Sequence, residues 1–193
     1  MFNFLLSYSQ VVNHQFNVGL KSGVGKEFEN SNYSFTNKYY KIEIDYLLKK
    51  YTSISFEIVV QPEINFGTHQ LLNFYFVQPE EADYEAKRAE FTQLKNFNQY
   101  ILNVGFLARK KLFKQLTIFA LASVGPMISD VETERLSKGF AFSDVFTLGL
   151  SYSFKRIRLD ISPSVRHVSN AGLQYSNAGF NTKNIEFGLV HEF

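Results

Sequence analysis

The sequence lacks several features on which common protein functions depend. It has no cysteine among its 193 residues, so disulfides and thiolate metal sites are excluded. The net charge of +2 is small and no arginine-rich run occurs, so we expect no nucleic-acid partner. His14, His69 and His191 have no carboxylate at the spacing of a metal site, and no glycine-rich phosphate loop is present. The sequence therefore predicts neither a metal nor a cofactor.

Long hydrophobic runs are also missing. No stretch reaches the roughly 18–20 uncharged apolar residues that a transmembrane helix needs, and the mean hydropathy is −0.14. Transmembrane barrels escape this test, because only every second residue of their strands meets lipid. At the N-terminus, residues 1–10 resemble the remnant of a secretory signal, and Ser7-Tyr8-Ser9 predicts cleavage near Gln10. Residues 11–193 would then form a single domain.

The dominant pattern is an alternation of apolar and polar residues with a period of two, which is typical of β-strands. In the clearest early segment, Ile54, Phe56 and Ile58 share one face while Ser55 and Glu57 share the other. Eight such segments are predicted as strands: 15–26, 39–48, 52–67, 98–110, 115–128, 141–154, 156–169 and 182–193.

The connections between these segments alternate in length. Short ones lie near 49–51, 110–114 and 155–156, and long ones at 27–38, 68–97, 129–140 and 170–181. This pattern predicts an eight-stranded antiparallel transmembrane β-barrel of the bacterial outer membrane. The terminal Phe193 favours this over a soluble ligand-carrying barrel, in which the apolar face would point inward.

The same pattern predicts details of the wall. The charged residues of the polar face would fill the interior: Glu43, Asp45, Glu57, Glu63, Arg109, Arg158, Asp160, Arg166 and Glu186. Pro62, Pro126 and Pro163 fall in the middle of strands, where we expect local bulges. The loop 79–97 has a helix-forming composition.

A candidate site lies at the end of the segment 156–169. His167 and Ser169 are two residues apart, so in a strand they point to the same face at a spacing of about 7 Å. An imidazole near a hydroxyl is the minimum arrangement for an activated serine nucleophile. Counted back by twos, the pair continues the apolar row of Val165 and Ile161, which predicts that both polar residues face lipid.

The stretch from His167 to Asn181 resembles the lipid A 3-O-deacylase family of the PagL type. The matching residues are His167, Ser169, Asn170 and Ala171, followed by Asn177 and Gly179. The resemblance implies an outer-membrane esterase that removes the acyl chain at position 3 of lipid A, with its active site on the lipid-facing side of the barrel toward the outer leaflet. It implies Ser169 as nucleophile and His167 as general base.

The resemblance also implies roles for the following loop, with one departure from the family. Asn170, Gly172 and Asn177 would position the substrate and bind the oxyanion. Where the family has a glutamate that orients the histidine, this chain has Asn181. An asparagine can fix the histidine tautomer but cannot stabilise the imidazolium by charge.

Two hypotheses for the function follow from the sequence. In the first, lipid A within lipopolysaccharide is the substrate, and outer-membrane lipid surrounds the barrel. In the second, the chain is a non-catalytic eight-stranded outer-membrane barrel with a structural or adhesion role. The sequence leaves a homodimer open.

Overall fold

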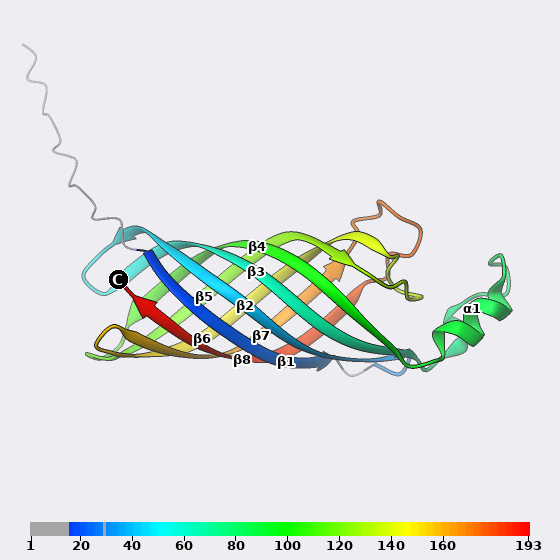
Figure 1. Cartoon of the computed structure of the whole chain (residues 1–193), viewed down its shortest axis with the longest axis horizontal. Coiled ribbons are helices and arrows are strands. Elements are labelled where there is room, and N and C mark those ends of the chain that lie inside the picture. Colours follow the sequence, from blue (N-terminus) through cyan, green and yellow to red (C-terminus); the bar gives the residue numbers. More distant parts are fainter. Residues whose placement is uncertain (1–15, 29) are drawn as a thin grey trace, which may run out of the picture.

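The computed structural model describes residues 16–28 and 30–193, and these residues form a closed β-barrel (Figure 1). Each strand pairs antiparallel with the next, and the first pairs with the last. The predicted fold class is confirmed. The strands are β1 Phe16–Glu27, β2 Tyr33–Lys50, β3 Ile54–Leu71, β4 Lys95–Lys111, β5 Leu116–Ser129, β6 Gly139–Phe154, β7 Ile157–Ser169 and β8 Phe180–Glu192. The predicted signal remnant at residues 1–10 lies outside the described residues.

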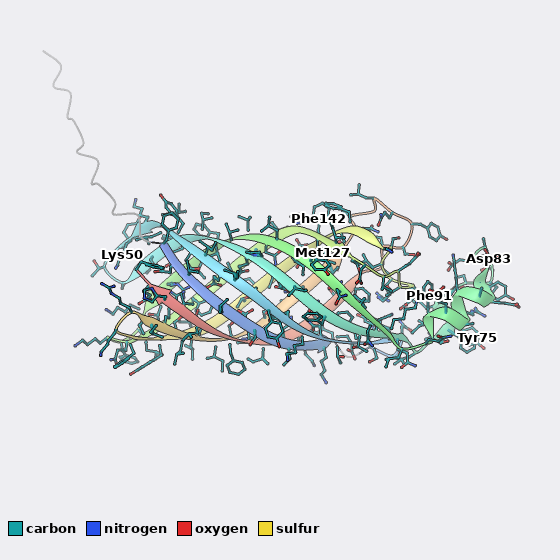
Figure 2. All side chains as sticks on the ribbon, in the orientation of Figure 1. Lys50, Tyr75, Asp83, Phe91, Met127 and Phe142 are labelled. Carbon is teal, nitrogen blue, oxygen red and sulfur yellow. The ribbon has the colours of Figure 1, made fainter. Side chains whose placement is uncertain are left out.

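The two ends of the barrel differ, as the loop lengths predict. Short turns close one end, where Lys50 lies, and long loops extend from the other, where Tyr75 and Asp83 lie (Figure 2). The longest loop holds a short 3-10 helix, η1 Phe74–Phe76, and the helix α1 Tyr84–Phe91. Within the described part of the chain, no helix is long and apolar enough to cross a bilayer.

The wall separates two chemically different surfaces, because side chains alternate between them along every strand. Large apolar side chains such as Leu20, Tyr100 and Leu159 are exposed on the outside. All nine charged residues predicted for the interior are buried there. They are joined in ion pairs, among them Lys21–Glu43 at 2.8 Å and Arg158–Asp45 at 2.6 Å.

Toward the long loops, the lumen changes from ionic to aromatic. The cluster that fills it consists of Tyr33, Phe35, Phe97, Ile101, Met127, Leu136, Ala141, Val168 and Phe180. Here β2 and β3 run further than predicted, starting at Tyr33 and ending at Leu71. The sequence boundaries were too short because apolar residues occupy the inward positions at this end, which breaks the alternation of polar-in and apolar-out.

The bulges expected at the three prolines are wrong. Pro62, Pro126 and Pro163 each stay in register with one neighbouring strand, opposite Leu102, Phe142 and Ile185 respectively. On the other side, pairing is interrupted for two residue pairs and then resumes without a shift. A proline removes one ladder donor, and the barrel absorbs this as a gap on one side. The register shift found instead lies between Leu47 and Lys49.

Candidate active site on the outer face

His167 lies on the outer surface of the barrel wall, between two polar neighbours. It is exposed on β7, and its Cα partners across the ladder are Asp144 on β6 and Asn181 on β8. Both neighbours are exposed as well. Directly opposite residues in an antiparallel pair have Cβ atoms about 4.5–5.5 Å apart. The three polar side chains therefore form one row across three strands.

Asn181 holds the histidine ring in place. The Nδ1 atom of His167 lies 2.8 Å from Oδ1 of Asn181. With a carbonyl oxygen as partner, Nδ1 carries the proton and donates it, which leaves the lone pair on Nε2. Nε2 makes no hydrogen bond among the described residues. It is therefore available to accept a proton from a hydroxyl.

Ser169 is the last residue of β7 and is half-buried on the same outer face as His167. Its cross-strand partner is Phe142, which Figure 2 labels in the half of the barrel nearer α1. Within the described chain, no hydrogen bond joins the Ser169 hydroxyl to His167. Their spacing along one strand keeps them close, and catalytic hydrogen bonds are often long before substrate binds.

The loop after Ser169 is held by Asn170, whose side chain is fully buried. Its Nδ2 donates to the Ser176 carbonyl at 2.8 Å and its Oδ1 accepts from the Gly172 N–H at 3.0 Å. Its backbone N–H donates to Oδ1 of Asn177 at 2.7 Å. The structure thus brings Asn170, Gly172 and Asn177 together, and these groups are used in building the loop.

Two donors of this loop are left over. Asn170 to Leu173 form a tight turn closed by a 3.0 Å bond from the Leu173 N–H to the Asn170 carbonyl, with positive φ at Ala171 and Gly172. Within the described chain, neither the Ala171 N–H nor Nδ2 of Asn177 has a hydrogen-bond partner. Ala171 follows Ser169 by two residues, and the side chain of Asn177 contacts the backbone of Asn170, the residue after Ser169. Both donors are therefore available to an oxyanion.

Gly179 fixes how the loop returns to the wall. Its φ is +64°, and an added Cβ would lie 2.2 Å from the Val168 carbonyl oxygen and 3.5 Å from Cβ of Ser169. Only glycine fits this position without strain. Arg135, from the loop between β5 and β6, donates to the Gly179 carbonyl at 2.6 Å and holds the chain against Ser169.

Asp144 is a member of the outer-face polar row that the sequence analysis did not single out. Its neighbours on the outward row of β6 are Phe142 and Phe146, so it interrupts an apolar face in the same way as His167 does on β7. The same parity test would therefore have found it. Asp144 makes no ion pair within the described part of the chain.

An apolar depression lies beside the polar row. It has a volume of about 560 Å³, and His167, Asn181 and Asp144 are among the residues that line it. The apolar side chains that line it are Phe28, Ala122, Val124, Phe146 and Val165. This is within the usual size range of ligand sites. A hydrocarbon chain is the ligand chemistry that such a lining fits.

His69 has a carboxylate partner that sequence spacing did not reveal. Its Nε2 lies 2.8 Å from Oε2 of Glu134, which comes from the loop between β5 and β6, and both side chains are buried. The pair lies beside the aromatic rings of Tyr33 and Phe180. It ties this loop into the mouth of the barrel and takes no part in the outer-face row.

By its architecture, this closed eight-stranded antiparallel barrel with an apolar outer face belongs to the outer-membrane β-barrels. More particularly, the chain belongs to the lipid A 3-O-deacylase (PagL) family, which residues 76–190, more than half of the chain, match. The family consists of lipid A deacylases, and membership assigns the chain to the bacterial outer membrane. No curated protein sequence matches it.

Solved structures agree on the fold. The crystal structure of the outer membrane enzyme PagL is similar with a TM-score of 0.62 and 14% identity, over 88% of this chain and 97% of that one. Neisserial surface protein A (NspA) is similar with a TM-score of 0.55 and 11% identity, over 92% of this chain and 97% of that one. At these identities the likeness concerns the barrel alone.

Proposed function

We propose that this chain is a serine esterase that releases the acyl chain from position 3 of lipid A, working on the outer face of the barrel. The observation that carries the proposal is the 2.8 Å contact between His167 and Asn181 on the lipid-facing surface. A polar, oriented histidine is costly in this environment, and polar groups facing lipid most often have a functional task.

The reaction starts with Ser169. Its hydroxyl oxygen attacks the ester carbonyl carbon while Nε2 of His167 takes the hydroxyl proton. The tetrahedral intermediate collapses when His167 returns that proton to the sugar oxygen, which leaves as the free 3-hydroxyl. Water, activated by His167 in the same way, then hydrolyses the acyl-enzyme and releases a fatty acid. The serine–histidine hydrogen bond forms by side-chain rotation when substrate binds.

Other residues of the outer face have supporting roles in this proposal. Asn181 keeps Nδ1 of His167 protonated, so that Nε2 is the base. The acyl chain lies in the apolar depression of about 560 Å³. The loop built on Asn170, Gly172 and Asn177 presents the Ala171 N–H and Nδ2 of Asn177 to the oxyanion.

Asp144 compensates for the missing family glutamate. When His167 becomes an imidazolium, neutral Asn181 offers it no charge. The carboxylate of Asp144 approaches the ring from the opposite strand, because Asp144 and His167 are cross-strand partners. In this proposal, orientation comes from one neighbour of the histidine and charge from the other.

A second candidate function is a non-catalytic barrel with a structural or adhesion role. It is favoured by one observation, the lack of a hydrogen bond between Ser169 and His167 among the described residues. The two functions differ in one measurable product, a free fatty acid.

The test is a mass spectrum of lipid A from cells with and without the protein. We expect loss of one acyl chain, assigned to position 3 by fragmentation. Ser169→Ala and His167→Ala should each reduce fatty acid release by at least about a thousandfold, and the double variant should be little worse, because the two residues act as a unit.

Matched controls exist on the same strands. Ser164→Ala removes a serine of β7 that faces the lumen, and His191→Ala removes a histidine near the far end of β8. Both should retain activity. Unchanged lipid A in the presence of a folded parent protein, or near-full activity of Ser169→Ala, would refute the proposed mechanism.

A further inference from the structure

Three lysines gather on the outer face beside the candidate active site. Lys26 on β1 and Lys183 on β8 are direct Cα partners. Lys38 on β2 is the diagonal neighbour of Lys26, whose direct partner there is Thr36. All three side chains are exposed. We refer to Lys26, Lys38 and Lys183 as the lysine cluster.

The cluster is unfavourable for the barrel on its own. Like charges directly opposite each other on a sheet destabilise it, and lysine on a lipid-facing wall costs more the deeper it lies. Lys21 and Lys41 in the lumen have carboxylate partners at 2.8 and 2.6 Å. Within the described chain, no carboxylate lies within ion-pair distance of the lysine cluster. Its positive charge is therefore left for an anion from outside.

The cluster adjoins the proposed site. Lys183 follows Asn181 by two residues on the same face of β8, and its partner on β7 is Val165, two residues before His167. Lys26 is the residue before the last of β1, so the cluster lies toward the end of the barrel with the long loops. A molecule held at His167 can thus reach the cluster with a group a few ångströms away.

The ligand chemistry follows from the charge and the spacing. Opposite side chains on a sheet start about 5 Å apart at Cβ, so the long side chains of Lys26 and Lys183 can converge on one small anion. A phosphate monoester carries a charge of about −1.5 to −2 near neutral pH, and lysine binds phosphate as a point charge. Clusters of basic residues at a membrane surface bind anionic headgroups in this way.

We propose that the lysine cluster binds a phosphate group on the headgroup of the glycolipid substrate and so positions the ester at Ser169. This inference rests on the proposed function for the identity of the glycolipid. It adds a recognition site on β1, β2 and β8, separate from the residues that break the ester.

The experiment measures binding without hydrolysis. The full chain carrying Ser169→Ala, in detergent micelles, is titrated with phosphorylated lipid A and with lipid A from which the phosphates have been removed. We expect Lys26→Gln/Lys183→Gln to weaken binding of the phosphorylated lipid by roughly ten- to thirtyfold. Binding of the dephosphorylated lipid should be unchanged.

A matched control removes the same charge at the other end of the barrel. Lys50 and Lys110 are exposed strand residues near the short turns (Lys50 in Figure 2). Lys50→Gln/Lys110→Gln should bind both lipids like the parent. The proposal would be overturned if this control lost as much affinity for the phosphorylated lipid as Lys26→Gln/Lys183→Gln does. It would also be overturned if Lys26→Gln/Lys183→Gln lost the same affinity for both lipids, or lost none.

Two further readouts separate this inference from others. Lysine-dependent binding of inorganic phosphate as tight as that of lipid A would overturn the assignment to a lipid headgroup. If the parent protein binds phosphorylated lipid A through the cluster but releases no fatty acid, the proposed esterase function fails and the binding site stands. If it hydrolyses both lipids with equal KM, the binding site fails and the function stands.

Discussion

The lumen and the outer face of this barrel treat charged residues in opposite ways. In the lumen, Arg166 binds Glu63 through two nitrogens at 2.7 and 2.8 Å, and both side chains are buried. On the outer face of the same strand, His167 lies two residues before its end and is exposed. Its cross-strand partners, Asp144 on β6 and Asn181 on β8, are exposed as well. One side of β7 therefore buries a closed ion pair, and the other side presents polar groups that remain open.

The difference follows from the cost of burying charge. A buried charge needs a partner, because leaving it alone costs several kcal/mol. The lumen meets this requirement within the chain, so its polar residues build the barrel. On the outer face, the Nε2 atom of His167, the carboxylate of Asp144 and the lysine cluster have no hydrogen bond or ion pair with the residues that the structure describes. In the proposed function, these groups gain partners when the substrate binds.

The largest expected effect comes from removing one partner of a buried ion pair in the lumen. Glu63→Ala leaves the Arg166 guanidinium buried without its carboxylate, and we expect the free energy of unfolding to fall by about 3–5 kcal/mol. Lys183→Gln, an exposed residue without an ion-pair partner, should change it by less than about 0.5 kcal/mol. Urea titrations in micelles, followed by circular dichroism, measure both. Equal midpoints for Glu63→Ala and the parent would contradict the contrast.

A double replacement serves as the control for that experiment. Replacing a buried ion pair with apolar residues of similar volume is often neutral. Glu63→Leu/Arg166→Met should therefore recover most of the stability lost in Glu63→Ala. Failure to recover it would mean that the position, not the unpaired charge, determines the loss.

The sequence predicted the two surfaces because lipid imposes a strict rule on every second residue. The eight strands, the inward charges and the outward placement of His167 and Ser169 follow from this period of two. Asp144 obeys the same logic and was overlooked because a single polar residue on β6 lacked a companion within its own strand.

Other features depend on contacts that no local pattern encodes. The pair His69–Glu134 joins residues 65 positions apart. The strand ends at Tyr33 and Leu71 lie in an aromatic zone where the inward face turns apolar, so the alternation that identifies the strands stops before the strands do. The roles of Asn170 and Gly172 within the loop likewise became visible only through their hydrogen bonds.

A smaller effect on the rate of fatty acid release is expected when the orientation of the His167 ring is disturbed. Asn181→Leu removes the acceptor for Nδ1, so the imidazole loses its fixed tautomer and the rate of fatty acid release should fall by roughly tenfold or more. Asn181→Glu introduces the carboxylate that the resemblance implies at this position, and it should preserve or raise the rate. Both rates are measured on the same lipid A substrate. A parent-like rate for Asn181→Leu would reduce the site to a serine–histidine dyad.

The smallest expected effect concerns the charge that Asp144 supplies. Exposed ion pairs contribute about 0.2–1 kcal/mol, so Asp144→Asn should lower kcat by roughly two- to fivefold. KM should stay unchanged, because the charge acts on the imidazolium formed during the reaction. The informative variant is Asp144→Asn/Asn181→Glu, which moves the carboxylate from one neighbour of His167 to the other across β7. If charge beside the ring is what matters, this double variant regains the parent kcat or exceeds it, since the new carboxylate also contacts Nδ1. A parent-like kcat for Asp144→Asn alone would show that the site works without a charged neighbour.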